Sequence, residues 1–284
     1  MRVVWYHGNC WDGFGAAYAL WCKFGDHDTT YTAVNYGTAP PAIPPGAREL
    51  WLVDFTYPID DLWMLRKRFD RMCIIDHHKT AEQTLTLMHR EGFCCDVKIF
   101  DMEHSGAYLT YRHVNPDVAP KNVPLLYDYL QDRDLWRFEL PESQAVNAYI
   151  KTVPYEFEAF AALQLKLQAD FNRTVSEGKA ILRLIDRTVE MMCEQAHTQV
   201  IDGYQVPTVN AAAFWSEMGH ALLDRYPDAS FVCTYFDRAD GQRVYSLRSR
   251  DDFDCSAVAK RMGGGGHKSA AGFTCEIDQP PTAR

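Results

Sequence analysis

Histidine and aspartate side chains follow three apolar runs that each predict a β-strand. VVWYH ends in His7, LWLVD ends in Asp54, and MCIID ends in Asp76, which His77 and His78 follow directly. Parallel strands place their carboxyl ends at one edge of a sheet, so these side chains can converge although they lie far apart in the sequence. Imidazole nitrogens and carboxylate oxygens together suit Mn²⁺ or a similar divalent cation. The sequence therefore predicts a metal centre at a sheet edge, with enough ligands for two ions.

Two further stretches offer metal ligands. HGNCWDGFG places Cys10 and Asp12 on a glycine-containing turn ahead of a helix of small residues, and LLYDYLQDRDLW offers Asp132 and Asp134 at the end of a helical run. Taken singly, a histidine or aspartate at a strand end is more often a cap or loop residue, and Cys10 is equally well interpreted as a small buried apolar residue. Adjacent side chains in extended backbone point opposite ways, so one histidine of the pair after MCIID would bind metal and the other would face substrate.

A glycine-rich stretch near the C-terminus, MGGGGHKSAAGF at residues 262–273, predicts an anion-binding loop. Consecutive glycines let backbone N–H groups approach an anion closely, and His267 with Lys268 adds charge to the same place. The spacing of a Walker motif is absent. The competing interpretations are a flexible turn for the glycine stretch and a surface ion pair for Arg248. The candidate substrate-binding residues are Arg248, Ser249, Gly264, Gly265, Gly266 and His267.

The elements that must position these residues alternate between strands and helices through the first half of the chain. This succession is typical of an α/β fold with a largely parallel sheet flanked by helices. Residues 155–196 carry apolar side chains at helical spacing and predict a helical connector. A second α/β pattern follows, so we expect a catalytic domain at 1–185 that includes the connector, and a smaller domain at 198–284, with the active site in the cleft between them.

Composition limits the class of protein. The chain has 284 residues, 47% hydrophobic and 24% charged, and a net charge of −9, which argues against a broad basic surface for long nucleic acid. No apolar run is long enough for a membrane span, and no secretory signal opens the chain. Nine cysteines without a C-x-x-C spacing indicate neither a disulfide framework nor a structural zinc module. We expect a cytoplasmic protein without a membrane partner, and a homodimer is left open.

Taken in order, these motifs resemble those of the DHH phosphoesterases that carry the DHH-associated C-terminal domain. The resemblance covers nearly the whole chain, from His7 and the Asp-Gly at residues 12–13 through Asp54 and the DHH run at 76–78 to the terminal GGGGH and AAG. It implies hydrolysis of phosphoester or phosphoanhydride bonds with two Mn²⁺ ions. Matched position by position, His7 and Asp54 resemble the ligands of one ion. The residues that resemble the ligands of the other ion are Asp12, Asp54, His77 and Asp132. Asp54 would bridge the two.

The chain departs from the family at Cys10, where the family usually has an aspartate. A thiolate there would soften the first metal site and favour Zn²⁺ or Fe²⁺, or the site would be weaker and fill only with substrate. We expect Cys10 to be a metal ligand in a retained two-metal site. His78 would contact the scissile phosphate or assist the leaving oxygen, and Asp76 would orient the histidine pair.

These features predict a metal-dependent phosphodiesterase or exonuclease that hydrolyses short single-stranded oligonucleotides or dinucleotides to mononucleotides through a metal-activated water. One alternative is a phosphatase of small phosphoanhydrides or nucleotide phosphates, such as polyphosphate or adenosine bisphosphate. A nucleotide-binding regulatory module with a decayed site is another, which the cysteine at position 10 permits.

Overall fold

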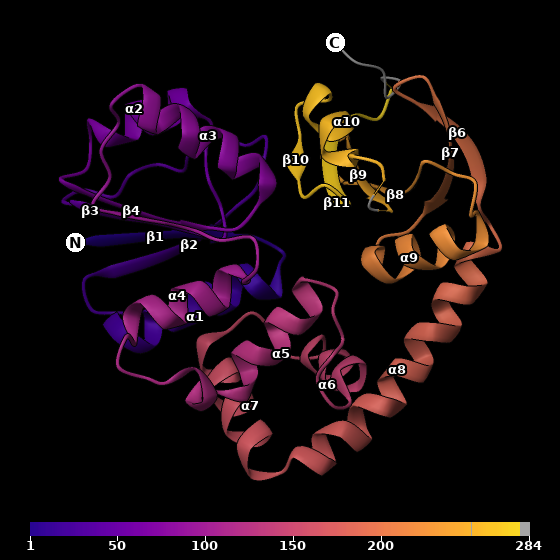
Figure 1. The fold of residues 1–284 in the computed structure, drawn as a ribbon, viewed down its shortest axis with the longest axis horizontal. Helices are drawn as coiled ribbons and strands as arrows, with labels where there is room; N and C mark the ends of the chain where they lie inside the picture. Colours follow the sequence, from indigo (N-terminus) through magenta and orange to yellow (C-terminus); the bar gives the residue numbers. More distant parts are fainter. Residues whose placement is uncertain (251, 279–284) are drawn as a thin grey trace. The chain divides into compact units, whose positions relative to one another are not determined.

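The computed structural model describes residues 1–250 and 252–278, and the chain forms two compact units that meet at Leu182 and Arg183 within a long helix. The α/β architecture predicted from the sequence is confirmed in both (Figure 1). No helix in the described part of the chain is both long enough and apolar enough to cross a bilayer.

Unit 1 is built on a five-stranded, entirely parallel sheet with the order β2-β1-β3-β4-β5. Its strands are β1 (Arg2–His7), β2 (Thr29–Val34), β3 (Glu49–Val53), β4 (Arg71–Asp76) and β5 (Val97–Phe100). The central strands are buried on both faces, which is why their sequences are continuous apolar runs. The carboxyl ends of β1, β3 and β4 therefore lie side by side.

Alternation along the strands decides which helices cover each face. Val3 and Trp5 share one apolar cluster with side chains of α2 (Ile59–Arg66) and α3 (Lys79–Arg90), whereas Val4 packs with α1 (Trp11–Phe24) and α4 (Gly106–Val114). Figure 1 shows the two helix pairs on opposite faces of the sheet. Both α1 and α4 begin at the carboxyl edge of the strands, so their first turns face the predicted site.

A helical layer packs on the outer side of α1 and α4. It consists of the short helix η1 (Pro120–Asn122), α5 (Leu125–Asp134), α6 (Ser143–Ile150), α7 (Phe157–Ala169) and the first half of α8 (Phe171–Cys193). Phe14 and Tyr18 of α1 meet Phe160 of α7 at ring-centroid distances of 4.7 and 5.8 Å. This layer fixes α5 so that its last turn approaches the start of α1.

Unit 2 is a six-stranded mixed sheet with the order β10-β11-β9-β8-β7-β6 and two helices. The sequence pattern predicts one long strand over 198–211, but the chain turns at Asp202 and Gly203, both with positive φ, and forms an antiparallel hairpin. The elements are β6 (His197–Ile201), β7 (Tyr204–Asn210), α9 (Trp215–Arg225), β8 (Phe231–Asp237), β9 (Gln242–Ser249), α10 (Cys255–Arg261), β10 (Gly265–Gly266) and β11 (Ala270–Glu276).

Candidate metal centre

Asp54 is the residue on which the site is centred. It directly follows β3 and adopts a left-handed backbone conformation with φ of 56°, while its N–H donates to the Ile75 carbonyl at 2.8 Å. Aspartate tolerates this conformation better than most residues with a Cβ. A side chain at Gly106, the first residue of α4, would place its Cβ 2.7 Å from Asp54 Oδ1. Glycine at 106 therefore allows the helix to start directly against the carboxylate.

The carboxylate of Asp54 contacts histidines from the two neighbouring strands. Asp54 Oδ2 lies 3.3 Å from His7 Nδ1, and Asp54 Oδ1 lies 3.0 Å from His77 Nε2. Burial disfavours the ionised carboxyl, but the contacts with His7 and His77 hold the pKa of Asp54 well below its usual value. Burial lowers the pKa of His77, but the carboxylates of Asp54 and Asp134 outweigh this effect and raise the pKa to about 10. Asp54 is therefore a buried anion shared between two imidazoles.

Two groups of three ligands surround this shared carboxylate. His7, Asp54 and His78 form one, and Asp12, His77 and Asp134 form the other; within each, one ligand atom from every residue lies within 4.8 Å of the others. Nε2 of His77 is 3.8 Å from Asp12 Oδ2 and 3.5 Å from Asp134 Oδ2. Asp54 belongs to the first group and touches the second through His77, as expected of a ligand between two ions.

The first turns of α1 and α4 hold Asp12. Gly13 packs so closely on the end of β1 that a Cβ there would lie 2.2 Å from the His7 carbonyl oxygen. The backbone N–H of Ala107 donates to Asp12 Oδ1 at 3.2 Å, which leaves Asp12 Oδ2 turned toward His77. Burial, with Asp54 and Asp134 nearby, raises the pKa of Asp12 well above its usual value. The His77 imidazole lies among the three carboxylates and offsets part of their mutual repulsion.

Several buried oxygens of the centre accept no hydrogen bond of good geometry from the described residues, although His7 and His77 lie within 3.3 Å of Asp54. They are Asp12 Oδ2, both carboxylate oxygens of Asp54, and Asp134 Oδ2. Buried polar atoms are normally satisfied, and oxygens left in this way are a signal of an absent ligand. The donor set of imidazole and carboxylate fits one or two divalent cations.

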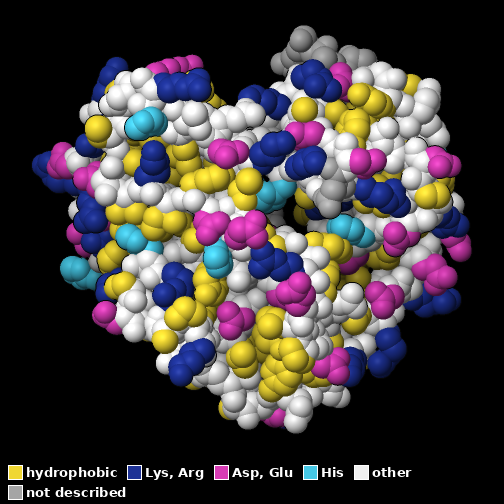
Figure 2. Space-filling view, viewed as in Figure 1, with side chains coloured by type: hydrophobic (Ala, Val, Ile, Leu, Met, Phe, Trp, Pro, Cys, Tyr) yellow, Lys and Arg dark blue, Asp and Glu magenta, His cyan; other side chains and the backbone are white. Residues whose placement is uncertain are grey.

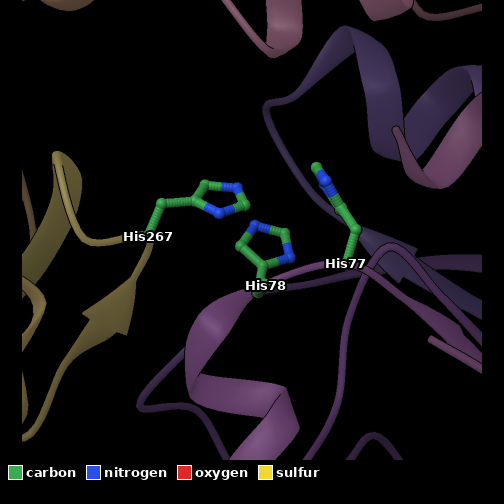
Figure 3. Close-up of side chains that lie close together, drawn as sticks. All are labelled: His77, His78 and His267. Atoms are coloured by element: carbon green, nitrogen blue, oxygen red, sulfur yellow. The ribbon is translucent and has the colours of Figure 1, made fainter. Parts of the chain in front are cut away.

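Asp76 lies outside the two groups and is hydrogen-bonded to His78, a member of the first. Asp76 Oδ1 accepts the backbone N–H groups of His77 and His78 and contacts His78 Nδ1 at 2.8 Å, while Asp76 Oδ2 accepts the Thr56 hydroxyl at 2.6 Å. Burial opposes ionisation, but the His78 imidazole holds the pKa of Asp76 below its usual value. The carboxylate thus fixes the ring of His78. Figure 3 shows the two histidines side by side after β4, with ring centroids 4.7 Å apart and an interplanar angle of 64°.

The structure places Asp132, a predicted ligand, away from both groups. Its carboxylate accepts the backbone N–H groups of Glu139 and Leu140 at 2.9 and 3.2 Å and so caps the loop after α5. Asp134, two residues further along the same helix, reaches His77 instead. Two residues correspond to about 200° of helical rotation, so the two acids point in different directions. The sequence offered both acids, and the distinction needed the helix orientation.

Cys10 lies beside the centre without entering either group of three. It is the N-cap of α1, and its side chain makes no capping hydrogen bond. Burial, followed by the nearby carboxylates of Asp54, Asp134 and Asp12, raises the pKa of its thiol well above the usual value. Without a cation, the sulfur is therefore held as a neutral thiol.

Sequence reasoning missed two features of the centre. The N-terminus of α4 supplies the Ala107 N–H to Asp12, and Ser105 caps that helix by accepting the Tyr108 N–H. The Ser-Gly pair that follows a strand-like run was the available signal. Tyr36 packs edge-on against His7 and His78 at centroid distances of 5.4 and 5.7 Å, and no motif marked it.

The substrate-binding residues predicted in unit 2 lie around β9 to β11. Arg248 donates to Ser216 Oγ and to the Leu247 carbonyl, each at 2.8 Å, and Ser249 Oγ donates to carbonyls of Phe253 and Lys268. Two of the glycines, 265 and 266, form the short strand β10 rather than an open turn. The N–H of Gly264 donates to the Ala259 carbonyl. His267 follows β10 (Figure 3), and its N–H donates to the Ala270 carbonyl. Their role in binding substrate stays a prediction.

No family model matches the chain. It is 29% identical over 292 residues to an uncharacterised protein of Acanthamoeba polyphaga mimivirus, a match that covers 95% of this chain and 66% of that one. It is 28% identical over 217 residues to oligoribonuclease NrnB of Bacillus subtilis, covering 72% of this chain and 52% of NrnB. The chain thus spans between half and two thirds of the length of these relatives.

Solved structures share the fold. An exopolyphosphatase-related protein from Bacteroides fragilis matches with a TM-score of 0.50 and 14% identity, over 96% of this chain and 86% of that one. RecJ from Thermus thermophilus, in complex with Mn²⁺, also matches with a TM-score of 0.50, at 16% identity over 97% of this chain and 49% of RecJ. Identities this low establish a common architecture and leave activity to be argued from the site.

Proposed function

We propose that the chain is a metal-dependent phosphodiesterase or exonuclease of the DHH phosphoesterase family, acting on short oligonucleotides or dinucleotides and releasing mononucleotides. The observation that carries the proposal is the pair of ligand groups around Asp54, whose buried carboxylate oxygens face imidazoles and accept no hydrogen bond of good geometry from the described residues. The similarity to an oligoribonuclease and the fold shared with RecJ support the substrate class.

The residues that would hold two divalent cations are His7 on one side and Asp12, His77 and Asp134 on the other, with Asp54 between them; His78 is kept for the phosphate. When bound, two cations at such a centre lower the pKa of a water and neutralise charge on phosphoryl oxygens. Mn²⁺ is our choice because the donors are imidazole and carboxylate, and RecJ in the matching structure holds Mn²⁺. In this proposal Asp134, rather than the Asp132 expected from the sequence, provides the ligand from α5.

Two side chains of the protein, His78 and Asp76, would control proton transfer during hydrolysis. Hydrolysis joins a water oxygen to phosphorus and breaks the bond to the leaving oxygen, which must gain a proton. Nδ1 of His78 faces Asp76, so a proton on Nδ1 is held there and Nε2 is the atom that can contact the phosphate or deliver a proton to the leaving oxygen. Asp76 is a positioning residue, since it acts through His78.

A phosphatase of small phosphoanhydrides is the second candidate, and the fold shared with an exopolyphosphatase-related protein favours it. Both candidates use the same centre, so they differ in what lies beyond the scissile phosphate. A short substrate suits the surface, because acidic and basic side chains alternate on the face shown in Figure 2 and the net charge is −9. A regulatory module with a decayed site would bind nucleotide without turnover. We keep Arg248 and His267 as candidate substrate contacts.

Product analysis tests the proposal. The purified chain would be incubated with Mn²⁺ and end-labelled single strands of two to ten nucleotides, with tripolyphosphate and adenosine bisphosphate in parallel. We expect mononucleotides as products and the highest rates on the shortest strands. Release of phosphate from tripolyphosphate without cleavage of any dinucleotide would favour the phosphatase, and tight nucleotide binding without cleavage would favour the regulatory module.

A further inference from the structure

Two aromatic rings lie next to the metal centre on the surface of unit 1. Trp11 stands between Cys10 and Asp12 in the sequence and opens α1. Tyr155 lies in the segment 151–156 between α6 and α7, with 39% of its surface exposed. Their ring centroids are 5.1 Å apart with an interplanar angle of 42°. The phosphodiester chemistry proposed above uses neither ring.

Cationic groups accompany the two rings. Lys151 Nζ lies 5.5 Å from the centroid of the Trp11 ring, and Arg133 precedes Asp134 on α5. Burial, followed by the Cys10 thiol, raises the pKa of Tyr155, and Arg133 opposes this, so the phenol lies within electrostatic reach of both. Lys151 and Arg133 thus bring positive charge close to the two rings. A phosphate-linked ligand is complementary to this arrangement.

The packing of the two rings leaves part of their surface and one polar atom unused. Tyr155 rests on Phe14 at a centroid distance of 5.5 Å, which anchors one edge of the ring to the core while much of the residue stays exposed. The buried indole Nε1 of Trp11 has no hydrogen-bond partner among the residues that the structure describes. An indole N–H usually finds an acceptor when buried. A planar, hydrogen-bond-accepting ligand would satisfy both features.

We propose that Trp11 and Tyr155 form a nucleobase-binding platform of unit 1, which stacks on the base of the nucleotide whose phosphate reaches the metal centre. This inference rests on the proposed function, because a nucleotide substrate is what brings a base beside the centre. Base stacking on aromatic side chains is sequence-tolerant, since every base has a π-face. The platform would therefore select nucleotides over polyphosphate without selecting a base.

The test compares two ligands that differ only in the base. Calorimetric affinities for AMP and for ribose 5-phosphate would be measured with the full chain and Mn²⁺, for the wild type and for Tyr155→Leu, Tyr155→Phe and Trp11→Leu. Tyr204→Leu is the matched control, because Tyr204 is also 39% exposed and packs on Phe231 and Phe253 of unit 2 rather than on Trp11 or Tyr155. Thermal melting would confirm that each variant folds.

We expect the wild type to bind AMP about tenfold or more tightly than ribose 5-phosphate, the scale of one stacking contact. Tyr155→Leu and Trp11→Leu should bring the ratio close to one, while Tyr155→Phe and Tyr204→Leu keep it. A ratio that stays at the wild-type value in both leucine variants, or a wild type that does not distinguish the two ligands, overturns the platform. Hydrolysis assays separate the two proposals: a Tyr155-dependent ratio without phosphodiester cleavage would refute only the proposed function.

Discussion

Nε2 of His77 lies 3.0 Å from Oδ1 of Asp54, and on the other side of the same carboxylate His7 Nδ1 lies 3.3 Å from Oδ2. One buried acid thus separates two imidazoles from neighbouring strands. In the metal-free protein the imidazoles supply the positive charge that Asp54 needs. Divalent cations would replace those protons, because metal binding requires neutral imidazole.

Asp134 and Asp132 should behave oppositely when changed to asparagine. Asp134→Asn removes a carboxylate beside His77, so Mn²⁺ affinity should fall about tenfold to a hundredfold with little change in the melting temperature. Asp132→Asn weakens two bonds to backbone N–H groups, so it should cost about 1–3 kcal/mol of stability and leave the metal affinity nearly unchanged. Calorimetric Mn²⁺ titration and thermal melting measure both quantities. The reverse pattern would return the ligand role to Asp132.

Asp76→Asn should lower kcat about tenfold to a hundredfold and leave KM nearly unchanged. The amide cannot hold His78 Nδ1 and the two backbone N–H groups as the carboxylate does. Thr56→Val, which removes only the hydroxyl that donates to Asp76, should have the same effect on a smaller scale. Steady-state kinetics on a dinucleotide checks this. Parallel changes of KM and kcat would indicate that the pair binds substrate.

Substitutions of Cys10 test whether its sulfur is a metal ligand or only lies near the metal centre. Because its sulfur lies outside both groups of three and its thiol pKa is raised, Cys10→Ser should change Mn²⁺ affinity less than about threefold. Cys10→Asp adds a carboxylate next to three others, so it should lower the melting temperature of the metal-free protein and increase Mn²⁺ affinity. A large loss of metal affinity in Cys10→Ser would make the sulfur a ligand after all.

Asp128 should make stability depend on pH. Burial raises the pKa of this carboxyl to about 6 from a usual value near 4, so the folded state binds its proton more tightly than the unfolded state. Its contribution to stability is therefore present below pH 4 and is lost as the pH rises through 6. Asp128→Asn should be more stable than the wild type at pH 7.5 and lose that advantage by pH 4. An equal difference in melting temperature between Asp128→Asn and the wild type at pH 4 and pH 7.5 would contradict the raised pKa.

The sequence predicted the fold of unit 1 well because its strands are buried on both faces and read as continuous apolar runs. It also placed His7, Asp54 and the residues after β4 at one sheet edge, since parallel strands share a direction. The resemblance selected Asp132 rather than Asp134 as the ligand, because the rotation of α5 that separates the two acids cannot be derived from sequence spacing. The hairpin was missed although the sequence marks it, because Asp202-Gly203 between two β-rich runs is a typical two-residue turn.

Other contacts in the site join residues far apart in the sequence, so motif spacing does not predict them. The approach of Ala107 to Asp12 joins residues 95 positions apart, and the Trp11 and Tyr155 rings meet only because the helical layer folds back on α1. The glycine stretch was interpreted as an open loop, but two of its glycines pair as β10 with β11. Such contacts follow from tertiary packing.

Asp54→Asn offers the most direct test, since asparagine keeps the size and tolerates the left-handed backbone at this position. Mn²⁺ stoichiometry and dinucleotide hydrolysis would be measured together on wild type and variant. The prediction is two ions per wild-type chain, loss of at least one in the variant, and a fall in turnover of about a thousandfold or more with an unchanged fold. Wild-type turnover by the variant, or turnover by metal-stripped wild type in chelator, would contradict a shared carboxylate at a two-metal centre.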